Sequence, residues 1–331
     1  MREKIARRTL LRLAGSTLLA APALSWAQSG PWPNRPIKVV VPFAGGGGTD
    51  VTMRLLAPKL SEILGQPIVI ENRPGGGSTV GTDFVAKSAP DGYSFVLATL
   101  SSTGIAASLY ASLPYDPAKD LAAIAPTVFI PIALGITQRG WPVRTLEEFT
   151  AALKAKPDGY SYGSSGIGTT GHIASANFLR VVGARAIHVP YRGGGQSFTA
   201  LVTGEVQFTH DIPSLLKPFH EAGTSRVLFT NHPERWRSLP DVPTAAELGL
   251  PDYKAYSWYG LFGPAGVPHP IQEKLAAAVD QALADPAIAT RLEELNTPAM
   301  RGWNPERFAR YVVEEIETWA PLVRASGARV E

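Results

Sequence analysis

The chain has 331 residues, of which 45% are hydrophobic and 18% charged, and it contains no cysteine. This length suggests roughly two domains, each large enough to form its own core. The formal charge is +3, but residues 1–27 hold five basic residues and one acid, so the remainder is close to neutral, at about −1. A nucleic-acid or anionic-membrane partner is therefore not indicated, and stability has to come from packing rather than from disulfides.

The first 27 residues have the order of an export signal. Basic residues between positions 2 and 12 precede an apolar run from Leu13 to Leu24, and Ser25-Trp26-Ala27 then forms a small-x-small cleavage pattern. The apolar run is too short for a permanent membrane anchor. The sequence thus predicts a cleaved signal peptide over residues 1–27 and a processed chain without membrane insertion. Arg7-Arg8 fits either the twin-arginine or the general secretory route.

Strand-like and helix-like segments then alternate. Ile37–Phe43 is a near-continuous apolar run, typical of a parallel strand that is buried on both faces. Residues 49–64 carry a helical apolar stripe that includes Val51. Further strands are predicted over residues 67–73 and 92–100, with a helix around residues 82–87 between them. Repeated strand-helix-strand units favour an open α/β sheet.

A second series begins near Val128. It contains five predicted strands, over residues 130–137, 160–165, 186–191, 206–211 and 226–231. Helices are predicted between them over residues 145–155, 170–182 and 193–204. One more apolar strand (257–266) and two helices (270–284 and 305–325) complete the chain. Because each series has its own alternation, we expect two lobes with boundaries near residues 128 and 255.

Four glycines, in the sequence VVVPFAGGGGTD, connect the first strand to the first helix. No lysine follows Gly48, so the loop lacks the phosphate counterion of a P-loop, and the contiguous glycines do not match the dinucleotide pattern. What remains is a helix N-terminus whose free amides, reached through glycines, attract a small anion such as a carboxylate. The alternative is a tight turn in which Thr49 or Asp50 caps the helix.

A second loop of this kind occurs in the second series. YSYGSSGIGTTGHIA runs from a strand through glycines and hydroxyls into a helix, and its polar residues are Ser164, Ser165, Gly166, Gly168, Thr169 and Thr170. One such loop in each lobe would place two helix N-termini around one cleft. An ordinary serine-rich turn is the alternative. The serines also leave a secreted hydrolase open, although Gly163–Ile167 lacks the last glycine of a nucleophile elbow. The histidines show no metal-ligand spacing, so neither metal nor cofactor is expected.

Seven ordered segments, among them RPIKVVVPFAGGGGTDVTMRLLAPKL, VIENRPGGGSTVG, YSYGSSGIGTTGHIA and HVPYRGGGQSFTALVTGEV, resemble the Bug/TctC extracytoplasmic solute receptors of tripartite tricarboxylate transporters. The resemblance extends from about Trp32 to the C-terminus. It implies a two-lobed periplasmic binding protein of type II (a Venus flytrap), each lobe a mostly parallel sheet flanked by helices. Lobe 1 would comprise residues 28–128 and 255–331, with the C-terminal helices packed back on it, and lobe 2 residues 129–254.

The resemblance also implies where a ligand would bind. The first anion loop would correspond to Phe43–Asp50, including Phe43, Ala44, Gly46, Gly47, Thr49 and Asp50, and the second to Ser164–Thr170. Asp211 would lie at the cleft, with Ser101 and Ser102 as further contacts. Asp50 or Asp211 could then favour a ligand that carries an ammonium group.

The expected function is capture without chemistry. The sequence together with the resemblance predicts a monomeric periplasmic receptor that delivers a small carboxylate (a di- or tricarboxylate, an acidic amino acid or an aromatic acid) to membrane transporter subunits. Two alternatives remain at this point: a secreted serine hydrolase using Ser164 or Ser165, and a ligand sensor for a two-component system.

Overall fold

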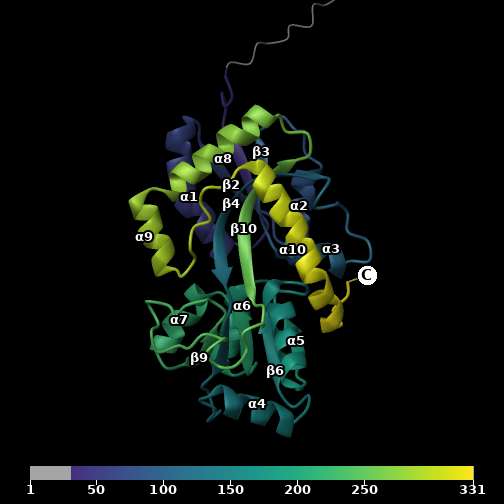
Figure 1. Ribbon diagram of the computed structural model, residues 1–331, viewed down its shortest axis with the longest axis vertical. Helices are drawn as coiled ribbons and strands as arrows, with labels where there is room; N and C mark the ends of the chain where they lie inside the picture. Colours follow the sequence, from purple (N-terminus) through teal and green to yellow (C-terminus); the bar gives the residue numbers. More distant parts are fainter. Residues whose placement is uncertain (1–30, 331) are drawn as a thin grey trace, which may run out of the picture.

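A computed structural model describes residues 31–330. They form two lobes, each with a five-stranded sheet, that follow one another along the long axis of the molecule (Figure 1). The predicted signal peptide, residues 1–27, lies outside the described residues. Among the residues that are described, no helix combines the length and apolar character needed to cross a membrane.

The sheet of lobe 1 has the strand order β2-β1-β3-β10-β4. β10 is antiparallel to both of its neighbours, and the other strands share one direction. The predicted first strand, β1, is almost wholly buried, which confirms that both of its faces are covered. The bounds of the five strands are β1 Ile37–Val41, β2 Ile68–Asn72, β3 Ser94–Thr99, β4 Leu121–Pro131 and β10 Tyr256–Pro264.

Helices from both ends of the chain cover this sheet. Figure 1 shows α1 and α9 on one side of it and α2, α3 and α10 on the other. The helices are α1 Gly48–Leu64, α2 Thr79–Ala86, α3 Ala106–Leu109, α8 His269–Leu283, α9 Pro286–Glu294 and α10 Pro305–Ser326, with the short turns η1 Gly76–Ser78 and η2 Ser101–Ile105. The predicted packing of the C-terminal helices on lobe 1 is therefore observed.

The sheet of lobe 2 repeats this plan with the order β7-β6-β8-β5-β9, and β5 is its antiparallel strand. Its strands are β5 Ala133–Thr137, β6 Ser161–Ser164, β7 Ile187–Pro190, β8 Phe208–Asp211 and β9 Ser225–Thr230. Its helices are α4 Leu146–Ala155, α5 Thr170–Val182, α6 Gly194–Thr203 and α7 Pro213–Glu221. Both sheets are thus mostly parallel, as predicted.

Two crossing segments join the lobes. Only Ile132 separates β4 from β5, and the chain returns between β9 and β10. The crossings are hydrogen-bonded to each other, since the Ile132 amide donates to the Ala255 carbonyl (3.0 Å). Asn231 strengthens this junction: its side-chain oxygen accepts from the Ala255 amide at 2.9 Å, and its backbone amide donates to the Ile132 carbonyl at 2.9 Å. We propose these two segments as the lobe boundaries, close to the predicted residues 128 and 255.

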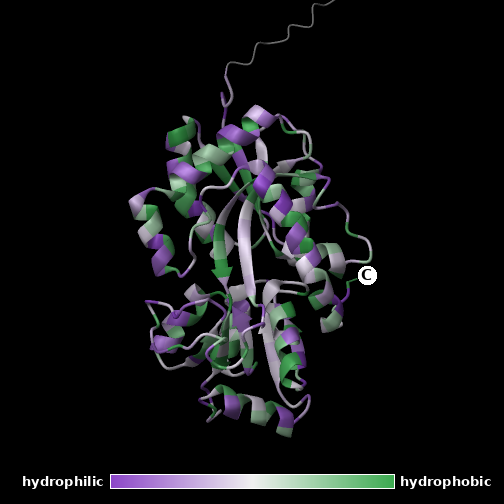
Figure 2. Cartoon of the chain, viewed as in Figure 1, coloured by the Kyte–Doolittle hydropathy of each residue, from purple (hydrophilic) through white to green (hydrophobic). Residues whose placement is uncertain are grey.

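The C-terminal helix is tied to lobe 1 by a buried carboxylate. α10 is amphipathic, with hydrophilic and hydrophobic residues mixed along its length (Figure 2), and its buried face includes Phe308 and Trp319. Glu315 lies on that face and accepts from the Tyr256 hydroxyl at 2.8 Å and the Trp258 indole at 3.0 Å. Burial raises the pKa of Glu315, and these donors oppose that shift. A buried carboxyl group with matched donors positions the helix on β10.

Most of β4, residues 121–129, was not among the predicted strands. Pro126 interrupts it in the sequence, and proline lacks the amide that a sheet interior needs. In the structure the register against β10 shifts at this point, between Tyr259 and Gly260, and β4 is the last strand of the sheet. An edge position with a bulge is where a strand can contain proline.

Candidate functional site

The loop between β1 and α1 ends in a helix N-terminus without a side-chain cap. Gly47 is the N-cap in extended conformation and provides no side-chain cap. The Val51 amide makes the first intrahelical bond, to the Gly47 carbonyl at 2.9 Å. The amides of residues 48–50 therefore have no intrahelical acceptor. Gly46 has φ +82°, a backbone conformation that favours glycine. The exposed turn and uncapped helix make this loop suitable for a small anion.

Asp50 stabilises this loop from within its own lobe. One carboxylate oxygen accepts from the Gly46 amide (2.9 Å) and from Arg54 Nε (2.8 Å), and the other accepts from Asn72 Nδ2 (3.0 Å). Burial alone would raise the pKa of Asp50, but the hydrogen bonds from Arg54, Gly46 and Asn72 outweigh it and the pKa is lowered. Because both carboxylate oxygens accept hydrogen bonds within lobe 1, we assign Asp50 a structural role in place of the selection of an ammonium-bearing ligand.

The loop between β6 and α5 has the same construction in lobe 2. Thr169 is the N-cap of α5, and its side chain donates to the Gly166 carbonyl (2.8 Å) instead of capping the helix. Gly168, with φ +76°, directs its amide to His172 Nδ1 at 3.1 Å. Thr169 therefore does not cap α5 with its own side chain, and the first helical amide, that of Thr170, bonds across to lobe 1.

Each of the two loops lies beside a contact with the opposite lobe. The Ser101 hydroxyl, at the start of η2 in lobe 1, accepts from the Thr170 amide of α5 at 3.2 Å and lies 3.3 Å from the Thr170 hydroxyl. Ser102 instead bonds within its own lobe, donating to the Thr99 carbonyl at 3.3 Å. Gly48 of α1 packs against Ile212 of lobe 2 so closely that a Cβ at this position would lie 2.4 Å from the isoleucine Cδ1. The lobes are closed on each other.

We predict that Ser101→Ala weakens ligand binding roughly two- to tenfold. The change removes one net hydrogen bond that forms only when the lobes close, and such a bond contributes about 0.5–1.5 kcal/mol. Calorimetric titration of the variant measures the loss. Ser102→Ala is the matched control, because its bonds lie within lobe 1 and it should leave affinity unchanged. Equal affinities for the two variants would contradict the role of Ser101.

Ser164 contacts a histidine, but the pair is not arranged for catalysis. Its hydroxyl lies 2.7 Å from His188 Nε2, yet Ser164 is fully buried. His188 stacks on His172 with ring centroids 3.8 Å apart. Burial, with a smaller contribution from His172, lowers the pKa of His188 to about 3, so it is a weak base. Ser164 and His188 therefore stabilise the β6–α5 loop.

Asp211 ends β8 and is almost completely buried, with 8% of its surface exposed. One oxygen accepts from the Ile212 amide at 2.8 Å, and the carboxylate lies beside Gly194 at the start of α6. No salt bridge to Asp211 occurs among the described residues. Burial raises the pKa of Asp211 to about 6, and the Ile212 amide only partly opposes this.

The predicted site residues thus fall into three groups. Ala44 and Gly46 are exposed at the first loop, while Phe43, Gly47 and Ser165 are half-buried. The remaining residues are buried, and most have partners described above: Thr49, Asp50, Ser101, Ser102, Ser164, Gly168, Thr169, Thr170 and Asp211. The structure brings Ser101 together with Thr170, whereas Asp50 and Ser102 bond within their own lobe.

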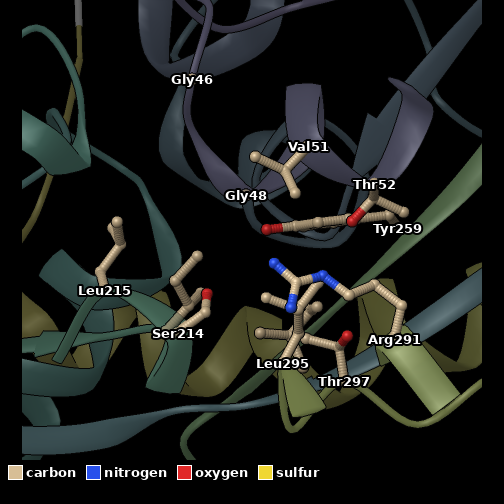
Figure 3. Close-up of a pocket in the computed structure, with 12 residues that line it drawn as sticks. Gly46, Gly48, Val51, Thr52, Ser214, Leu215, Tyr259, Arg291, Leu295 and Thr297 are labelled. Atoms are coloured by element: carbon tan, nitrogen blue, oxygen red, sulfur yellow. The ribbon is translucent and has the colours of Figure 1, made fainter. Parts of the chain in front are cut away.

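A cavity of about 180 Å³ lies between the lobes beside the tip of α1 (Figure 3). Of the predicted residues only Gly46 lines it. Its other lining residues come from distant segments of both lobes: Gly48, Val51, Thr52, Ile130, Ile212, Ser214, Leu215, Tyr259, Arg291, Leu295 and Thr297. No sequence pattern pointed to Arg291 or Thr297, because only the fold of the C-terminal segment brings them to the cleft. Within residues 31–330, no cluster of three histidine or acidic side chains could hold a metal ion.

Two mostly parallel α/β lobes, joined by two crossing segments and closed over a shared cleft, define a periplasmic solute-binding protein. A family model described as tripartite tricarboxylate transporter family receptor (TctC) matches residues 52–328. The chain belongs to this family, which confirms the resemblance found in the sequence. It is a solute-binding receptor and not an enzyme, so the hydrolase alternative is set aside.

Individual relatives are similar to this chain over nearly its whole length. Protein BugT of Bordetella pertussis is 32% identical, with 97% of this chain and 98% of BugT covered. The structure of MatC from Rhodopseudomonas palustris with bound malate superimposes with a TM-score of 0.83 at 35% identity, covering 88% of this chain and 99% of MatC. A second R. palustris protein, solved with adipate, has a TM-score of 0.84 at 33% identity and covers 90% of this chain and 100% of its own.

Proposed function

We propose that this chain is exported to the periplasm, captures a small carboxylate between its two lobes and delivers it to the membrane subunits of a tripartite tricarboxylate-type transporter. The observation that carries this proposal is the N-terminus of α1, which is reached through four glycines, has no side-chain cap and lines the cavity between the lobes. The malate and adipate bound to two similar proteins agree with it.

Backbone amides explain how a carboxylate is held. In this proposal the ligand docks on the amides at the start of α1, and closure then brings lobe 2 with the N-terminus of α5 toward it. The Gly168, Thr169 and Thr170 amides already bond to His172, Gly166 and Ser101, so α5 contributes through its dipole. Each hydrogen bond to a charged group contributes about 1.5–3 kcal/mol, and both helix dipoles favour the negative charge. Direct contact between Ser101 and Thr170 completes the closed form.

Asp211 is the proposed selectivity residue near the cleft. Its buried carboxylate faces the start of α6 without a cationic partner in the described residues. An ammonium group on the ligand would pair with it, whereas a plain carboxylate would favour its protonated form. The balance between these ligands should therefore depend on residue 211.

Thermal melting of the processed protein, purified from the periplasm, tests the function. The protein is first unfolded and refolded to remove any ligand that copurifies, and is then melted with a panel of dicarboxylates, tricarboxylates, acidic amino acids and aromatic acids. A ligand present at a hundredfold excess over its dissociation constant stabilises the native state by about 2.7 kcal/mol, so a true ligand raises the Tm clearly. A flat response across the panel would contradict a carboxylate receptor.

A further inference from the structure

Helix α5 of lobe 2 packs against lobe 1 as well as against its own sheet. Its residue Ile173 is fully buried. Among residues 31–330, Ile173 is the one member from lobe 2 in an apolar cluster whose other members, including Leu109, Trp319 and Val323, belong to lobe 1. The C-terminal end of α10 lies beside α5 in Figure 1, and the two helices are in contact. None of these four residues lines the cavity beside α1.

The helical period explains why Ile173 points to lobe 1. Residues three positions apart share a face of a helix, so Ile173 lies on the same face as Thr170. The Thr170 amide donates to Ser101 of lobe 1 at 3.2 Å. Phe178 lies on a different face and stacks on Phe149 of lobe 2, with ring centroids 5.8 Å apart. One face of α5 is thus directed at lobe 1 and another at the core of lobe 2.

A second close contact between the lobes lies at the start of the same helix. Gly168 approaches Leu109 so closely that a Cβ at residue 168 would overlap Leu109 Cδ2. The C-terminal segment holds the leucine in place, because the Val330 amide donates to the Leu109 carbonyl at 3.1 Å and the Ala111 amide donates to the Val330 carbonyl at 3.0 Å. Since Leu109 belongs to lobe 1 and Gly168 to lobe 2, this contact also requires the closed form.

We propose that Ile173 is a positioning residue for closure, because its insertion into lobe 1 stabilises the closed form through a contact outside the cavity. Opening would return its side chain to water, and burial of apolar surface favours the closed form. Ile173 therefore sets the ratio of closed to open protein without regard to the ligand. Apparent affinity scales with the population that can bind, so a change at Ile173 alters the affinity for every ligand by one factor. This last consequence rests on the proposed receptor function.

Disulfide trapping without any ligand tests the role of Ile173. The chain contains no cysteine, so an introduced pair is the only one present. The Ser101 and Thr170 hydroxyls lie 3.3 Å apart, so Ser101→Cys combined with Thr170→Cys should form a disulfide when the lobes close. Adding Ile173→Ala removes three buried carbons. It should lower the ratio of closed to open protein by about ten- to a hundredfold, and the disulfide should form more slowly under a mild oxidant.

Leu179→Ala is the matched control in the same double-cysteine protein. Leu179 is also buried on α5 and also loses three carbons on replacement by alanine. It shares a face of the helix with Ser175, whose hydroxyl lies 3.0 Å from His210 Nδ1 of lobe 2. Leu179→Ala should lower the Tm and leave the rate of disulfide formation unchanged.

Calorimetric titration with malate and with adipate provides a second readout, in proteins that retain Ser101 and Thr170. Ile173→Ala should weaken the binding of both compounds by the same factor, because it acts on closure and not on the ligand. Leu179→Ala should leave both affinities unchanged.

The outcomes separate this inference from the proposed function. The role of Ile173 is refuted if Ile173→Ala does not slow disulfide formation, if Leu179→Ala slows it equally, or if the double-cysteine protein forms no disulfide. Unequal losses of affinity for malate and adipate would refute it as well. If the wild type binds no carboxylate while Ile173→Ala alone slows disulfide formation, the role in closure stands and the proposed carboxylate-receptor function fails.

Discussion

Replacing Gly48 with valine is expected to weaken ligand capture by roughly ten- to a hundredfold while leaving the stability of the ligand-free protein nearly unchanged. The reason is a contact between the lobes. A Cβ at residue 48 would lie 2.4 Å from Ile212 Cδ1 of lobe 2 and 3.0 Å from the Tyr259 hydroxyl, and the branched valine adds two further methyl groups there. Overpacking of this kind costs about 1–3 kcal/mol. The closer clash, with Ile212, arises in the closed form alone, so most of the cost appears as lost affinity. The contact with Tyr259 lies within lobe 1 and needs a shift of only a few tenths of an ångström.

Gly47→Val is the matched control for this prediction. Gly47 belongs to the same loop, has an ordinary negative φ of −78°, and its added Cβ would meet only the Ala44 carbonyl at 3.6 Å. Calorimetry gives the affinities, and small-angle scattering with saturating ligand reports whether each variant closes. The interpretation is wrong if the two variants bind alike, or if Gly48→Val becomes as compact as the wild type when the ligand is added.

The sequence was sufficient for the regular parts of the fold. Continuous apolar runs such as β1 and helical stripes such as that of α10 are local patterns, and the structure contains both where they were predicted. The part of β4 before residue 130 was not predictable in this way, because Pro126 argues against a strand until its edge position and bulge are known. Val51 was assigned to the apolar stripe of α1, yet it is 38% exposed and lines the cavity, together with Gly48 and Thr52 of the same helix.

The candidate site was predictable only in part for a similar reason. Glycines and hydroxyls before a helix are visible in the sequence, so both loops were found. The partners of the side chains were not visible. Asp50 and Asp211 look equivalent as acids near glycine loops, but Asp50 meets Asn72 of β2 and Asp211 meets only backbone. Arg291 lies some 240 residues after Gly48 in the chain, and only tertiary structure brings both to one cavity.

The contrast between these two acids leads to a prediction about pH. Burial raises the pKa of Asp211 from 3.8 to about 6. Between these values the native state holds a proton that the unfolded state has released, so raising the pH across this window lowers the free energy of unfolding. Above about pH 6 the ionised carboxylate costs a constant amount, about 3 kcal/mol for a shift of this size. An asparagine side chain at this position would carry no such charge, and its oxygen could still accept from the Ile212 amide.

Asp211→Asn should therefore be more stable than the wild type at neutral pH, by up to about 3 kcal/mol, and should match it near pH 4, where Asp211 is protonated. Urea unfolding of the ligand-free proteins at the two pH values measures the difference, in which the other titrating groups cancel. Asp50→Asn provides the opposite case. The pKa of Asp50 is lowered, so its ionised form stabilises the fold at neutral pH and that contribution is lost as the pH falls through the lowered pKa. This variant should be less stable than the wild type at neutral pH, with a smaller difference in acid. An Asp211→Asn protein no more stable than the wild type at neutral pH would mean that the Asp211 carboxylate is not buried without a partner.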